Sequence, residues 1–214
     1  MWCVLSTAVA VVSCRPGAPG GPTVPWIVSN PIYVGLDLRS APAAILPDPV
    51  SRIPARTSEA AAESGPNDTS RVETGPLTDP RARTFAGDPA IFWSFGLSPG
   101  TAVGQFAAVP IPVSPGLEAF HAVQFRVSSP QPIRAWAQLR APVGNTERWG
   151  ATFYADSESR TITIPLAKFR PIGVTSSLQP PLAQVQFLLF VVDTLNSLPG
   201  SKGQLTISEV GFVK

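Results

Sequence analysis

Residues 133 to 140 read Ile133-Arg134-Ala135-Trp136-Ala137-Gln138-Leu139-Arg140, and their side chains alternate strictly in character. Successive side chains of a β-strand point to opposite faces of the sheet, so this octapeptide predicts a strand with two different faces. One face is apolar and suits a hydrophobic core. The other face carries Arg134, Trp136, Gln138 and Arg140. These are large groups that could hold a polar ligand.

The same pattern recurs on both sides of this octapeptide, with turn residues such as Ser128–Pro132 between the runs. We therefore expect strands at 70–74, 91–97, 105–111, 122–127, 133–140, 148–154, 161–164, 185–192 and 204–213. Many short strands at this spacing predict an all-β chain with a β-sandwich or jelly-roll fold. The N-terminal part carries no such pattern, and we expect it to be largely irregular.

The run Gln186–Val192 is apolar without alternation. Such a run predicts either a central strand buried on both faces or a short buried helix, because the period alone does not separate the two. Its β-branched and aromatic content favours the strand.

The composition indicates three regions. Charged residues make up 14% of the chain and hydrophobic residues 44%, which excludes a wholly disordered protein. The 25 prolines and 17 glycines imply many turns or a loosely structured segment. Residues 37–69 in particular are rich in Pro, Ala and Ser and show no sustained hydrophobic period. We predict a linker at 37–69, a β-sandwich domain at 70–214, and a separate segment at 1–36.

The formal net charge is only +2, and the arginines are scattered along the sequence. Nucleic-acid binding needs a concentrated positive surface, so the sequence predicts no nucleic-acid partner.

Two interpretations of the first fourteen residues stay open. Val4–Val12 followed by Ser13 and Cys14 is similar to a lipoprotein signal, which would place the protein outside the cytoplasm, although no Lys or Arg precedes the run. Alternatively, Ala8–Ser13 is a strand that belongs to an upstream domain. In either case the run is far shorter than the roughly 20 residues of a membrane span, so we expect no transmembrane segment.

A family resemblance rests on several motifs. Residues 15–22 and 25–34 resemble the closing segment of bacterial PHP-domain metallohydrolases. In that family a linker and a carbohydrate-module-like C-terminal domain follow, and that domain is itself similar to galactose-binding-like jelly rolls. Its motifs resemble Pro132–Arg134, Gln138–Arg140, Arg148–Gly150 and Leu189–Thr194. The resemblance implies an accessory domain whose partner is a PHP-type hydrolase domain.

The chain lacks the chemistry of that hydrolase. PHP catalysis uses a cluster of His and Asp ligands around two or three metal ions, whereas this sequence has a single histidine, His121. We therefore expect no enzymatic activity and no catalytic residue in this chain.

The polar face of residues 133–140 is the candidate ligand site. Sugars bind through aromatic rings that stack on their C–H faces and through planar polar groups that hydrogen-bond their hydroxyls, which suits Trp136 between Arg134 and Gln138. Arg140, Arg148 and Tyr154 would extend this surface if their strands are neighbours. Two functions stay open: a binding module for a carbohydrate-like ligand, or a structural domain whose polar face docks the hydrolase body and binds no ligand.

A structural calcium ion is a further candidate, because jelly rolls of this type often join their first and last strands through an oxygen-ligated ion. Glu73 and Glu209 are the carboxylates placed for that role. Calcium takes six to eight oxygen ligands, so most of the ligands would be backbone carbonyls.

Overall fold

The computed structural model describes residues 52–77, 89–100, 103–141 and 147–214. Within these ranges the chain forms strands and short 3-10 helices, with no α-helix. The strands are β1 (Arg52–Pro54), β2 (Glu63–Ser64), β3 (Thr69–Gly75), β4 (Ala90–Gly96), β5 (Phe106–Pro112), β6 (Ala122–Ser128), β7 (Ile133–Arg140), β8 (Arg148–Ala155), β9 (Arg160–Pro165), β10 (Arg170–Ile172), β11 (Phe187–Asp193) and β12 (Lys202–Val213). The 3-10 helices are η3 (Thr57–Glu59), η4 (Leu117–Ala119), η5 (Leu166–Lys168) and η6 (Leu182–Gln184).

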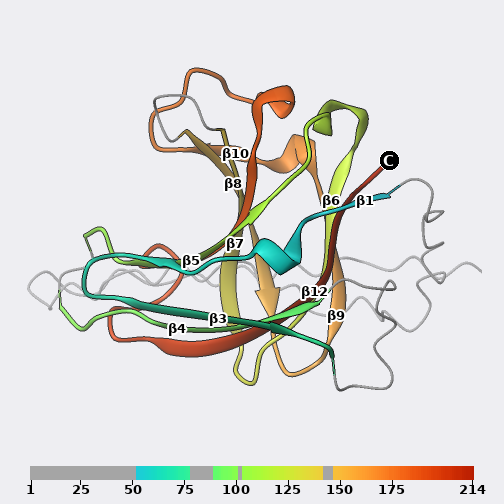
Figure 1. Ribbon diagram of the computed structural model, residues 1–214. Helices are drawn as coiled ribbons and strands as arrows, with labels where there is room; N and C mark the ends of the chain where they lie inside the picture. Colours follow the sequence, from blue (N-terminus) through green and yellow to red (C-terminus); the bar gives the residue numbers. More distant parts are fainter. Residues whose placement is uncertain (1–51, 78–88, 101–102, 142–146) are drawn as a thin grey trace, which may run out of the picture. The chain divides into compact units, whose positions relative to one another are not determined.

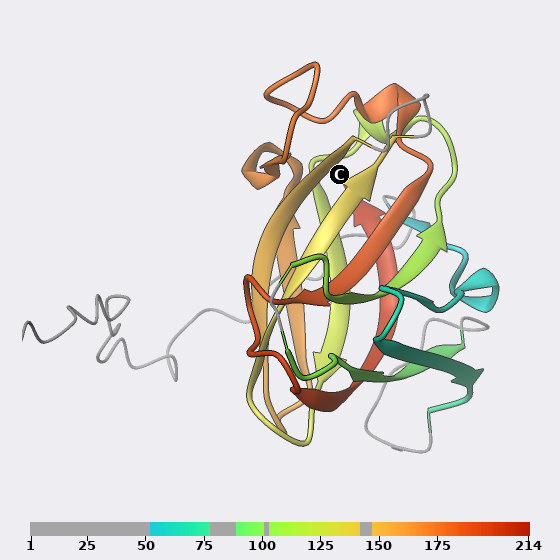
Figure 2. The same ribbon diagram turned by 90° about the vertical axis from the view of Figure 1, so that its left-hand side faces the viewer.

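The strands build two six-stranded antiparallel sheets that face each other (Figures 1 and 2). Sheet A has the order β3-β4-β12-β6-β9, and β1 also pairs with β12. Sheet B has the order β10-β8-β7-β11-β5-β2. The expected all-β sandwich is confirmed.

Each strand expected from the sequence is present, with ends that differ by at most two residues. The apolar run near residue 190 is also confirmed as a strand. It forms β11, which lies between β7 and β5 in sheet B. Leu188–Val192 are buried on both faces, because Leu188, Phe190 and Val192 enter the main core while Leu189 and Val191 lie on the outer side. Here and below, the outer face of a sheet is the one that points away from the opposite sheet.

The expected linker is wrong for residues 52–69. β1 pairs with β12 and β2 pairs with β5, so this segment contributes a strand to each sheet. Ala55 is 2% exposed, and its backbone N–H donates to the carbonyl of Val210 at 3.0 Å. Strands of two or three residues are too short to show a period, which explains why composition suggested a linker. The remaining residues of the predicted linker, and the segment 1–36, lie outside the described residues.

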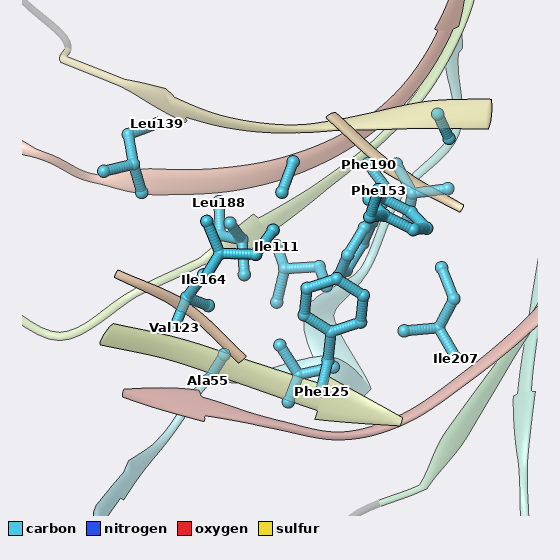
Figure 3. Close-up of a cluster of buried hydrophobic side chains, with 14 of the residues drawn as sticks. Ala55, Ile111, Val123, Phe125, Leu139, Phe153, Ile164, Leu188, Phe190 and Ile207 are labelled. Atoms are coloured by element: carbon cyan, nitrogen blue, oxygen red, sulfur yellow. The ribbon is translucent and has the colours of Figure 1, made fainter. Parts of the chain in front are cut away.

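The core between the sheets contains three phenylalanine rings that join the two layers (Figure 3). Phe125 comes from β6 of sheet A, whereas Phe153 and Phe190 come from β8 and β11 of sheet B. The ring of Phe125 lies 4.9 Å from each of the other two, at 71° and 73°. Edge-to-face pairs of this kind add about 0.5–1.5 kcal/mol each beyond their buried area. This cluster fixes which side of β8 and β11 faces inward.

An irregularity in β12 lets β1 join sheet A. The register of β12 against β6 shifts between Ser208 and Gly211, and Glu209 has a φ of 52°, which is unusual for a residue other than glycine. The guanidinium of Arg52 donates to the backbone carbonyl of Glu209. A Cβ atom on Gly211 would lie 2.8 Å from the carbonyl oxygen of Ile53, so this close approach of β1 requires glycine.

Candidate functional site

The six predicted ligand residues all lie on the outer face of sheet B. On β7, Ala135, Ala137 and Leu139 enter the core, so the alternate residues point outward. On β8, Trp149 and Phe153 enter the core, and Arg148 and Tyr154 point outward. The two strands are neighbours, with Arg134 opposite Tyr154 and Arg140 opposite Arg148. The surface proposed from the sequence is therefore continuous across β7 and β8; its members are Arg134, Trp136, Gln138, Arg140, Arg148 and Tyr154.

Trp136 is half-buried and is held on both edges of its indole. On the β11 side its Nε1–H donates to the carboxylate of Asp193, with an N–O distance of 3.2 Å. On the β8 side its Cε3 atom lies 3.2 Å from where a Cβ atom of Gly150 would be. Because Gly150 has no side chain, the indole reaches over β8 while it stays bonded to β11. This arrangement fixes the ring without covering it completely.

Asp193 belongs to the same face but was not among the candidate residues predicted from the sequence. Its Oδ1 atom accepts hydrogen bonds from the Trp136 indole, from the backbone N–H of Leu195 at 3.0 Å and from the Asn196 side chain at 3.4 Å. Desolvation raises the pKa of Asp193, although hydrogen bonds from the Trp136 indole and from the backbone N–H groups of Leu195 and Asn196, together with the charge of Arg148, act in the opposite direction. A sequence signal existed: Asp193 is the polar residue that ends the β11 run, with the same parity as the outward Leu189.

Arg140 and Gln138 are less available to a ligand than the sequence predicts. Arg140 forms an ion pair with Glu63 of β2 at 3.0 Å, and its guanidinium lies 4.7 Å from the centre of the Phe187 ring. Gln138 is on the predicted face but is only 1% exposed. Its Oε1 atom has no hydrogen-bond partner among the described residues. In this structure Gln138 supports the face from below and does not reach the surface.

Tyr154, Arg134 and Arg148 are the accessible members of the predicted group. Tyr154 is 48% exposed at the end of β8. Arg134 is exposed and Arg148 is half-buried. Within the part of the chain that the structure describes, neither arginine forms an ion pair or a hydrogen bond. Their donors are free to bind a ligand.

The two carboxylates proposed for calcium lie in different surroundings. Glu73 is on the outer face of sheet A, where it pairs with Arg71 at 2.7 Å. Glu209 lies in the bulge of β12, where desolvation raises its pKa while the charges of Arg126 and Arg52 lower it. No group of three or more His, Cys, Asp or Glu side chains that could hold a metal ion occurs among the described residues. Two nearby guanidinium groups oppose a cation at Glu209, so the residues present do not fit a calcium ion there.

Sheet A has a hollow of about 410 Å³ on its outer face. Three neighbouring strands line it in two rows, Arg71–Ser94–Gln204 and Glu73–Phe92–Thr206. Its two charged residues neutralise each other in the Arg71–Glu73 ion pair. Phe92, 36% exposed, is the aromatic residue available there. This hollow contains none of the residues predicted as ligand-binding, although Glu73 of the calcium prediction lines it.

No model of a protein family matches the chain, and no curated protein matches it. Solved structures do match. A family 11 carbohydrate-binding module of the cellulosomal cellulase Lic26A-Cel5E of Clostridium thermocellum matches with a TM-score of 0.57 and 14% identity, over 76% of this chain and 94% of that one. A family 11 module from the same organism, in complex with a β-1,3-1,4-mixed-linked tetrasaccharide, matches with a TM-score of 0.54 and 14% identity, over 72% and 88%. These likenesses establish a β-sandwich fold of the jelly-roll type found in carbohydrate-binding modules.

No helix among the described residues is long and apolar enough to cross a membrane.

Proposed function

We propose that this chain is a non-catalytic accessory module that binds a carbohydrate on the outer face of sheet B. The observation that carries the proposal is the half-buried Trp136, fixed between Gly150 and Asp193, with two unpaired arginines on the same face. Aromatic rings of this kind offer a surface for the C–H groups of a sugar, while Arg134, Arg148 and Asp193 supply donors and acceptors for its hydroxyls. The fold shared with family 11 carbohydrate-binding modules supports the same class of function.

The partner in this proposal is a PHP-type metallohydrolase domain to which the module is appended. The support for that attachment is the motif resemblance of residues 15–34 and of the β7, β8 and β11 motifs. The module would hold the hydrolase near a polymeric substrate, which raises the local concentration of substrate without any new catalytic group. In the competing hypothesis the same face docks the hydrolase body and binds no ligand.

The test is a glycan-array screen of the full chain, followed by isothermal titration calorimetry with the sugars it identifies and with a β-1,3-1,4-mixed-linked tetrasaccharide. Trp136→Ala should lower the affinity by about tenfold or more, since about 1.4 kcal/mol of lost stacking corresponds to a factor of ten. Phe92→Ala is the matched control, because it removes an exposed ring from the other sheet.

Binding that is lost in Phe92→Ala and kept in Trp136→Ala would move the site to the hollow on sheet A. A chain that binds no glycan, but binds a separately expressed PHP domain through Trp136, would establish the docking function instead.

A further inference from the structure

We propose that the ligand of the outer face of sheet B is an anionic glycan, one that bears carboxylate or sulfate groups. This inference rests on the proposed function and specifies the chemical class of its ligand. Four arginines point outward from this sheet, and two carboxylates oppose them. The arginines are Arg134, Arg140, Arg148 and Arg170, and the carboxylates are Glu63 and Asp193.

The arrangement of the arginines is unfavourable without a counter-ion. Arg140 and Arg148 are direct cross-strand partners on β7 and β8, and like charges in that position destabilise a sheet. Glu63 neutralises Arg140 through their ion pair, whereas Arg148 forms no ion pair among the described residues and has only a longer-range attraction to Asp193. Arg170, on the far side of β8, donates to the backbone carbonyls of Ala167 and Phe169 and has no carboxylate partner among the described residues. An anion bound over β8 would remove this repulsion.

The unpaired guanidinium groups flank the ring that would bind the sugar. Arg134 is two residues before Trp136 on the same strand, so both side chains point outward. Arg148 points outward from β8, the strand whose Gly150 and Thr152 lie beside Trp136. A planar guanidinium binds a carboxylate or a sulfate with two parallel hydrogen bonds, which a neutral hydroxyl cannot offer. The indole and two guanidinium groups therefore match a sugar ring with acidic substituents.

The carboxylates do not cancel this preference. Glu63 is already bonded to Arg140, and Asp193, whose Oδ1 atom accepts three hydrogen bonds from neutral donors, supplies one negative charge against the other three arginines. Glu147, which precedes β8, is bonded to the backbone and hydroxyl of Ser176. The outer face of sheet A differs, since the arginine of its hollow is neutralised by Glu73. Four arginines against these three carboxylates leave a small excess of positive charge on and beside the face that carries Trp136.

The experiment compares probes of equal length on the full chain by titration calorimetry. The probes are a tetragalacturonate, a sulfated galactan tetrasaccharide, the neutral mixed-linked tetrasaccharide and a single-stranded oligodeoxynucleotide. We expect an acidic tetrasaccharide to bind at least about tenfold more tightly than the neutral one at low salt. Raising the ionic strength from about 0.01 M to 1 M should weaken acidic binding strongly, because it shortens the screening length about tenfold. The comparison of uronate with sulfate identifies the acidic group.

Single substitutions test which arginines cause the preference for the acidic probes. Arg134→Gln and Arg148→Gln should each reduce the affinity for the acidic probe by about ten times more than they reduce the affinity for the neutral probe. Arg71→Gln on sheet A is the matched control and should change neither affinity.

Each other outcome rejects the inference. Equal affinity for acidic and neutral probes, with loss of binding in Trp136→Ala, overturns the anionic class and keeps the proposed function. Tighter binding of the oligonucleotide than of any glycan assigns the basic face to nucleic acid. Absence of binding to every glycan rejects both proposals.

Discussion

Two tryptophans on neighbouring strands of sheet B provide a direct test of the two faces. Trp149 of β8 is completely buried, and its indole N–H donates to the carbonyl of Ser177 at 2.9 Å. Trp136 of β7 is half-buried on the opposite face. Replacement of each by alanine removes the same side chain, so differences between the variants report the surroundings and not the chemistry of the residue.

The expected magnitudes follow from the burial. Trp149→Ala empties a site in the core and should lower the free energy of unfolding by about 3–5 kcal/mol. For a domain of this size, each 1 kcal/mol shifts the melting temperature by about 2–4 °C, which predicts a drop of roughly 6–20 °C. Trp136→Ala removes one hydrogen bond, worth about 0.5–1.5 kcal/mol, and part of a half-buried surface, so its total should be about half that of Trp149→Ala.

Binding should follow the opposite order. Trp149→Ala should keep most of the ligand affinity at a temperature where it is folded, and Trp136→Ala should lose it. Circular-dichroism melts and titration calorimetry on both variants measure the two quantities, and Trp149→Phe serves if the alanine variant does not fold. If Trp136→Ala is as destabilising as Trp149→Ala, or if both variants bind normally, the outer face of sheet B is not the ligand surface.

Two further predictions concern the N-terminal strands and the β12 bulge. A chain that begins at Ser70 lacks β1, β2 and the buried Ala55, so it should melt at a clearly lower temperature than a chain that begins at Ile45; equal melting curves would show that the first two strands add no stability. Burial raises the pKa of Glu209, so the folded state binds a proton more readily than the unfolded state, and stability should increase as the pH falls from that raised pKa toward the ordinary value of about 4.3. Glu209→Gln should abolish this increase, and above that pH interval the variant should be more stable than the unmodified protein. Denaturant midpoints measured from about pH 4 to pH 8 would test this. An unchanged pH dependence in the variant would contradict the assignment to Glu209.

The strands could be predicted because alternation is a local property. In β7 every second residue changes character, and the structure reproduces both its ends and its two faces. β1, β2 and β10 were missed because they have three, two and three residues. Their pairing is decided by β12, β5 and β8, whose edges need partners, and not by any pattern of their own.

The site was only partly predictable for a related reason. Parity alone places Arg134, Trp136 and Arg140 on one face, and it does the same for Arg148 and Tyr154. The order β8-β7-β11, however, brings together residues far apart in the chain, and Asp193 is 57 residues from Trp136. No local pattern in the sequence indicates that these two residues meet.

The apolar outer side of β11 forms a buried layer next to Asp193. Leu189 and Val191 are almost fully buried there, and Trp136, Phe106 and Phe187 pack against them with Ala108. Desolvation by burial raises the pKa of Asp193, which lies at the end of the same strand. Polar contacts made beside such a layer are stronger than contacts in open solvent, because the local dielectric constant is lower. This is the environment that the proposed carbohydrate site requires, because a few polar groups beside an apolar layer can discriminate between ligands.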